Sequence, residues 1–117
     1  MYVESFKQLI VWQKSMDLVR VVYSATSKMP KEEIFGLVSQ MRRCAVSIPS
    51  NVAEGKKRKT KNDFLQFLRI ADGSVGELET QIIIAKDLFR VDFSMADPLL
   101  EEVQKMLAVM IKRVSSL

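Results

Sequence analysis

Residues 36–61 read GLVSQMRRCAVSIPSNVAEGKKRKTK, and this stretch joins a helical apolar pattern, a proline and a dense cationic run. Apolar residues recur in steps of three and four, which is typical of one face of an amphipathic helix over about residues 34–54. Pro49 falls on that face and cannot donate to the carbonyl of Ala45, so we expect the helix to bend there. Gly55 then favours a left-handed helix end. The apolar positions are Ile34, Val38, Met41, Ala45, Ile48 and Val52.

A cationic run follows directly after Gly55. The chain has a net charge of +4, but residues 31–61 alone carry +5, whereas residues 62–117 carry −3. A local basic patch of this kind indicates a polyanionic partner such as RNA or DNA, or an acidic protein surface. The alternative interpretation is a solvated loop that only aids solubility. The basic residues are Lys56, Lys57, Arg58, Lys59 and Lys61.

Three further long helices are expected, over about residues 6–28, 60–89 and 94–117. The third has the most regular apolar pattern, a seam of alternating four- and three-residue steps that is typical of coiled coils and four-helix bundles. Gly73 and Gly76 lie within this helix, where glycine is unfavourable, and they indicate that a neighbouring helix passes close to the backbone. The seam consists of Phe64, Leu68, Ala71, Val75, Leu78, Ile82, Ala85 and Phe89.

The short connections between these helices favour antiparallel neighbours. We therefore predict one all-α domain, residues 1–117, folded as an up-down-up-down antiparallel four-helix bundle whose second helix is kinked at Pro49. Several helices are apolar on more than one stripe, for instance at Ile10 and Val11 and at Leu65 and Phe67, which exceeds what one core requires. This surplus predicts a homo-oligomer.

The composition argues against catalysis. The chain has no histidine, which is the commonest general base and transition-metal ligand. The single cysteine, Cys44, falls near the apolar face of the second helix, so we interpret it as a buried structural thiol and not as a nucleophile. No glycine-rich phosphate loop follows a strand. We expect no enzymatic activity, no metal and no cofactor.

The sequence also bears on location. No apolar run approaches the roughly 18 residues that a membrane helix needs. The first residues, MYVESFKQ, lack the basic and hydrophobic regions of a secretion signal. A lone cysteine excludes an internal disulfide and fits a reducing compartment. These features predict no membrane association and a cytoplasmic location.

A specific set of residues also suggests a family. The set consists of Phe6-x-x-Leu9-x-Val11-Trp12-Gln13-Lys14, then Gly36-Leu37-x-x-Gln40-x-Arg42-Arg43-x-Ala45-x-Ser47-Ile48-Pro49-x-Asn51-x-Ala53-Glu54-Gly55, then Phe64-x-x-Phe67-Leu68 and Gly73-Ser74-x-x-Glu77-Leu78-Glu79-Thr80. On these residues the chain resembles the small four-helix-bundle proteins encoded within intervening sequences of bacterial large-subunit (23S) rRNA genes. The resemblance implies an all-helical bundle, a homo-oligomeric, pentameric ring and no known catalytic activity. A similar bundle is an accessory protein to the reverse transcriptase of diversity-generating retroelements, where it engages nucleic acid and the polymerase.

Arg42 and Arg43 allow two interpretations. Adjacent helical positions differ by about 100°, so at most one of them points squarely away from the core. It either adds to the basic surface, because the arginine fork matches phosphate oxygens, or it pairs with Glu77 or Glu79 on another helix or subunit.

Two functions follow from these features. The first is a non-enzymatic, homo-oligomeric bundle that binds nucleic acid without sequence specificity through its basic loop. The alternative is a protein-interaction scaffold or accessory subunit whose basic loop docks an acidic protein partner. The candidate nucleic-acid-binding residues are Lys56, Lys57, Arg58, Lys59, Lys61, Arg42 and Arg43.

Overall fold

A computed structural model describes residues 5–117 of the chain, and in this range it contains helices and no strands. The four long helices are α1 (Ile10–Thr26), α2 (Ser39–Lys56), α3 (Lys61–Phe89) and α4 (Ala96–Ser115). They are accompanied by three short helical turns, η1 (Phe6–Gln8), η2 (Lys31–Glu33) and η3 (Ile34–Val38). The predicted all-α, four-helix fold is confirmed.

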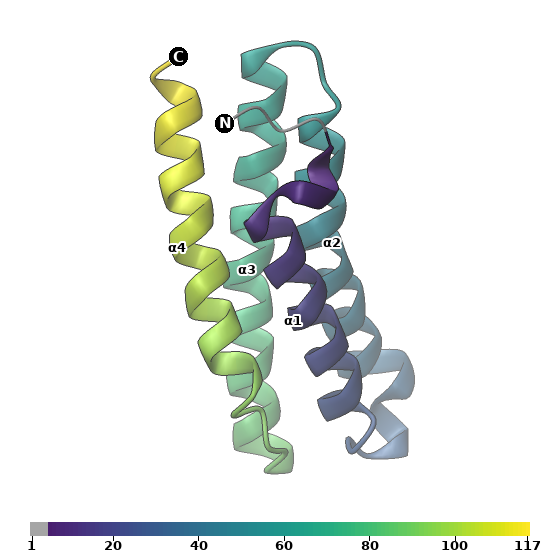
Figure 1. The fold of residues 1–117 in the computed structure, drawn as a ribbon. Helices are drawn as coiled ribbons and strands as arrows, with labels where there is room; N and C mark the ends of the chain where they lie inside the picture. The colour runs from purple at the N-terminus through teal and green to yellow at the C-terminus, as the bar shows by residue number, and fades with distance from the viewer. Residues whose placement is uncertain (1–4) are drawn as a thin grey trace.

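The long helices lie side by side, each antiparallel to the next along the chain (Figure 1). α1 packs against α2 and α4, and α3 packs against the same two helices, so that α1 and α3 lie diagonally opposite. The described residues form a rod of 46 × 23 × 20 Å. None of the described helices is both long and apolar enough to cross a membrane.

One continuous apolar core runs between the four helices. The seam predicted on α3 is confirmed, because its central residues are buried and its two end residues, Phe64 and Phe89, are packed against the core. The buried seam residues are Leu68, Ala71, Val75, Leu78, Ile82 and Ala85. Cys44 is buried and unpaired, as predicted.

The predicted first helix is interrupted near its start. Residues 6–8 form a 3₁₀ turn, Leu9 is extended (φ −71°, ψ 126°), and the α-helix begins at Ile10. The Ser5 side chain caps the turn by accepting a hydrogen bond from the backbone N–H of Lys7, 3.2 Å away. The Phe6 ring packs edge-on against Trp12, with 5.4 Å between ring centroids. Local capping and an aromatic contact therefore outweigh the helical pattern here.

The second helix also begins later than predicted. Residues 34–38 form a π-helical turn in which Gly36 is non-helical (φ −109°, ψ −113°), and α2 begins at Ser39. The Glu33 carboxylate accepts a hydrogen bond from the backbone N–H of Leu37 (3.3 Å) and thereby caps this turn. The neighbouring Phe35 is 97% exposed.

Pro49 is buried inside α2, which continues from Ser39 to Lys56 on both sides of it. The bend at Pro49 stays a prediction. The predicted left-handed cap at Gly55 is wrong, because no glycine among the described residues has a positive φ and α2 extends to Lys56. Gly55 is instead buried at the α2–α3 contact, where a Cβ atom would lie 2.7 Å from the Cβ of Phe67.

Gly73 and Gly76, unlike Gly55, have open space around them. Both are exposed, and a Cβ atom at either would meet no atom within 4 Å. The prediction that a neighbouring helix passes close to them is wrong within the single chain. The helix approach that needs a glycine lies at Gly55.

Candidate nucleic-acid interface

The basic loop, defined as Lys56, Lys57, Arg58, Lys59 and Lys61, is held by hydrogen bonds at both of its ends. At the α2 end, the backbone N–H of Lys57 donates to the carbonyl of Ala53 (3.2 Å), and that of Arg58 donates to Gly55 (3.1 Å). At the α3 end, the Thr60 hydroxyl accepts from the backbone N–H of Asp63 (3.1 Å) as an N-cap. The connection is short and capped, so its side chains project from a well-defined backbone.

Two of the five cations are engaged within the chain. Arg58 pairs with Glu54 (3.0 Å) and its guanidinium lies over the Phe67 ring, 4.8 Å from the centroid. The Lys61 ammonium donates to the carbonyl oxygen of Leu117 (2.8 Å). Arg58 therefore helps to fix the loop on α3, and Lys61 ties it to the end of α4.

The other three cations of the loop are available to a ligand. Lys57 and Lys59 are exposed and Lys56 is half-buried. None of them forms an ion pair within residues 5–117. Residues 5–117 do not neutralise their charge, and they can contact phosphates.

The fold brings two further cations to the same end of the bundle. α4 ends beside the α2–α3 connection (Figure 1), and the Lys61–Leu117 hydrogen bond joins the two segments. Lys112 and Arg113, in the last turn of α4, are exposed and form no ion pair with described residues. Sequence reasoning missed them because residues 62–117 are acidic as a whole, although the up-down topology predicts that the second and fourth helices end together. We call these two residues and the basic loop the basic end.

Arg42 is placed elsewhere and has a structural role. Its Nε donates to the Thr26 hydroxyl (3.0 Å), its Nη2 donates to the Tyr23 carbonyl (3.3 Å), and its guanidinium lies over the Tyr23 ring, 4.6 Å from the centroid. These contacts satisfy carbonyl and hydroxyl groups at the C-terminal end of α1. Within the chain Arg42 forms no ion pair with Glu77 or Glu79.

Arg43 is exposed and forms no ion pair among the described residues. The rise of an α-helix places it about 20 Å along α2 from Lys56. Arg42 and Arg43 thus lie away from the basic end, and the loop and the arginine pair do not form one contiguous patch.

The surroundings of Cys44 leave its thiol protonated. Burial, together with the nearby Glu77 carboxylate, raises the pKa of Cys44 from 9.0 to about 12. The thiol donates to the carbonyl of Ser74, 3.1 Å away. A thiol with such a pKa is a poor nucleophile at neutral pH. Among residues 5–117, no three His, Cys, Asp or Glu side chains gather in a way that would hold a metal ion.

The geometry defines an all-α four-helix bundle that gathers positive charge at one end. A comparison with protein families assigns the particular family. The chain belongs to the family described as 23S rRNA-intervening sequence protein, which matches residues 7–112. A comparison with curated proteins finds no match. The family name itself states no biochemical activity.

Proposed function

We propose that this protein is a non-catalytic, homo-oligomeric nucleic-acid-binding module that acts in the cytoplasm and contacts phosphates through its basic end. The observation that carries the proposal is the convergence of the basic loop with Lys112 and Arg113 from α4. A cluster of lysines whose charge no described residue neutralises attracts polyanions and releases their counterions on binding.

The chemistry of this surface favours binding without sequence specificity. Lysine ammonium groups act as point charges toward phosphates, and phosphate contacts carry no base information. None of the residues that define the basic end is aromatic. The nearby Phe67 is half-buried, and the Arg58 guanidinium covers its ring. Base stacking is therefore not part of the proposed contact.

Self-association would strengthen a weak single site. A homo-oligomer presents one basic end per subunit, and linked sites gain avidity without any new contact. The support for self-association is the apolar surface that one chain leaves exposed, which includes Ile10, Phe35, Ile84, Val109 and Met95.

The proposal that the protein is not an enzyme rests on its chemistry. The sequence has no histidine, and the pKa of its one thiol is raised to about 12. No general base or activated nucleophile is therefore evident near the basic end.

The experiment compares two double variants that remove equal charge. Lys57→Ala with Lys59→Ala removes two exposed cations from the basic loop. Lys28→Ala with Lys31→Ala removes two exposed cations beside the α1–α2 connection, at the opposite end of the bundle (Figure 1). Binding of a labelled RNA and a labelled DNA is measured by fluorescence anisotropy at low salt, with helicity checked by circular dichroism.

We expect the first double variant to bind both nucleic acids at least about tenfold more weakly than the wild type. The second double variant should bind as the wild type does. Equal losses of affinity in the two double variants would mean that net charge alone, and not the basic end, governs binding. Absence of wild-type binding at low salt would overturn the proposal in favour of a scaffold that docks an acidic protein.

A further inference from the structure

We propose that the groove between the start of α1 and the C-terminal half of α4 receives the outward face of α3 from a second copy of the chain. The inference rests on the homo-oligomeric part of the proposed function and gives that self-association a defined contact. The partner is identified by two surfaces of the same chain that match in apolar character and charge and that cannot meet within one chain.

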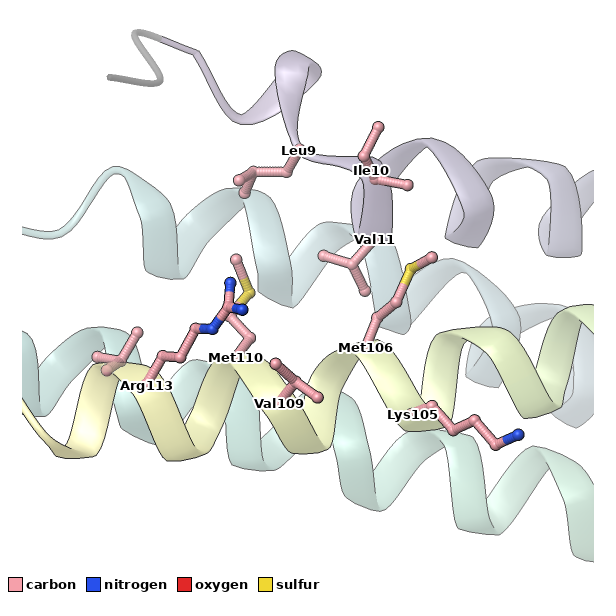
Figure 2. A pocket seen from close by; sticks show the side chains of 9 residues that line it. Leu9, Ile10, Val11, Lys105, Met106, Val109, Met110 and Arg113 are labelled. Atoms are coloured by element: carbon pink, nitrogen blue, oxygen red, sulfur yellow. The ribbon is translucent and has the colours of Figure 1, made fainter. Parts of the chain in front are cut away.

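The groove is open, has a volume of about 570 Å³ and is lined mainly by aliphatic and methionine side chains (Figure 2). The extended Leu9 leads into it, and Ile10 and Val109 remain 57% and 50% exposed on its walls. Met106 and Met110 line it from α4. Flexible methionine side chains adapt to an inserted apolar surface, and this composition is typical of grooves that accept a helix.

The groove is bordered by two cations on α4. Lys105 and Arg113 are eight residues apart, or about 12 Å along the helix. Lys105 pairs with Glu101 (2.9 Å) on the exposed surface. Arg113 forms no ion pair with any described residue and extends across Met110 in the groove (Figure 2). A complementary surface must therefore be apolar and carry an acidic group at its edge.

The outward face of α3 has these properties. Ile70, Gly73, Glu77 and Ile84 fall on one stripe at helical spacing, and all four are exposed. Glu77 forms no ion pair within residues 5–117. The two isoleucines supply apolar surface, and the Glu77 carboxylate supplies an opposite charge for Arg113. In the assembly Arg113 would therefore pair with Glu77, and Lys112 and the basic loop would remain to contact phosphates.

Gly73 gives separate support for a close contact between α3 and the groove of a second copy. An exposed glycine inside a helix is less favourable than alanine. No contact with the described residues requires it, because a Cβ atom there would meet none of their atoms within 4 Å. A helix backbone that approaches a groove closely does require a small residue.

The two surfaces lie on different sides of the bundle. The groove opens between α1 and α4, whereas α3 is diagonal to α1 and turns this stripe outward. One chain can therefore offer α3 to one neighbour and its groove to another. This is a heterologous contact, which generates a ring when its rotation closes.

The test measures assembly by sedimentation velocity at micromolar concentrations. Gly73→Leu should preserve or raise the thermal stability of the fold and yet weaken assembly by about tenfold or more. Arg113→Glu and Glu77→Arg should each weaken assembly by a similar factor. Lys31→Glu, which changes the net charge as Arg113→Glu does but lies at the far end, should assemble as the wild type.

The double variant Arg113→Glu with Glu77→Arg gives the decisive result. In this variant every groove meets an oppositely charged α3 face, whatever the number of subunits, so we expect assembly to recover. A monomeric wild type, normal assembly of Gly73→Leu, or no recovery in the double variant would each overturn the inference. Nucleic-acid binding by the wild type is recorded separately, because an assembled wild type that does not bind nucleic acid would count only against the basic end, and a monomeric wild type that binds at low salt would count only against this contact.

Discussion

Gly55→Ala is the substitution whose effect the structure defines most closely. In the folded chain the new Cβ would lie 2.7 Å from the Cβ of Phe67 and 3.1 Å from Cδ1 of Phe64. Two carbon atoms pack comfortably at about 3.5–4.0 Å. Since the Cβ of Phe67 is fixed to the α3 backbone and cannot swing away, α2 and α3 must separate locally.

The magnitude follows from two opposing effects. Overpacking of a tight contact destabilises by about 1–3 kcal/mol. Alanine in place of glycine within a helix stabilises by about 1 kcal/mol. The closest contact involves an atom attached to the backbone, which places the overpacking in the upper part of its range. We therefore expect Gly55→Ala to lower the free energy of unfolding by about 1–2 kcal/mol.

Gly73→Ala is the matched control. The chemical change is the same and the residue is also helical, but the new Cβ meets nothing within 4 Å. We expect this variant to unfold with a free energy about 1 kcal/mol higher than that of the wild type. The assay is chemical unfolding followed by circular dichroism, with assembly checked by sedimentation so that samples in the same state are compared. Stabilisation by both substitutions, or equal destabilisation by both, would refute the assignment of Gly55 as the close contact.

Three further predictions concern Arg42, Cys44 and Pro49. Arg42→Ala should destabilise the fold by about 1–2 kcal/mol in thermal unfolding, because it removes the hydrogen bonds to Thr26 and Tyr23 and the contact with the Tyr23 ring; unchanged stability would show that these contacts are incidental. Because the raised pKa of Cys44 favours the protonated thiol in the folded state, the wild type should lose stability relative to Cys44→Ala as the pH rises from about 9 toward 12. The same difference in free energy of unfolding between the two proteins at pH 7 and at pH 10.5 would contradict this. Pro49→Ala should lose stability by about 1 kcal/mol or lose assembly despite its better helix propensity, because Pro49 is buried in a packed face; a more stable variant that assembles normally would show that the proline is not needed.

The sequence predicted the helices with a regular apolar repeat and failed at their ends. The α3 seam was predictable because its four-and-three spacing continues from Phe64 to Phe89 without a break. The starts of α1 and α2 were not predictable, because they depend on local caps. These caps are the Ser5 side chain before η1 and the Glu33 carboxylate before η3. A cap is one hydrogen bond between particular atoms, and several nearby residues could have formed it.

The glycines show a second limit. Spacing alone indicates that a small residue lies within a helix, but not which neighbour requires it. The sequence pattern predicts a helix end at Gly55, which is a packing contact in the structure, and predicts packing contacts at Gly73 and Gly76, which are exposed. Only the relative rotation of α2 and α3 decides between these cases, and that rotation is set by the whole core.

The candidate interface was predicted in part. The basic loop is continuous in the sequence, and its exposure followed from its charge. Lys112 and Arg113 join it only through the fold, and Arg42 departs from it because Thr26 and Tyr23 lie across the α1–α2 contact. Counting charges along the sequence cannot reveal such contacts between residues that are far apart in the chain.

The salt dependence of nucleic-acid binding tests the central claim most directly. Each phosphate contact contributes a slope of about −0.9 for duplex or −0.7 for single strands in a plot of log affinity against log salt concentration. Wild-type protein should show a steep negative slope with either RNA or DNA. Lys57→Ala with Lys59→Ala should reduce the duplex slope by about 1.8 for each subunit in contact, whereas Lys28→Ala with Lys31→Ala should leave it unchanged. A wild-type slope near zero, or equal slopes in the two double variants, would contradict binding through the basic end.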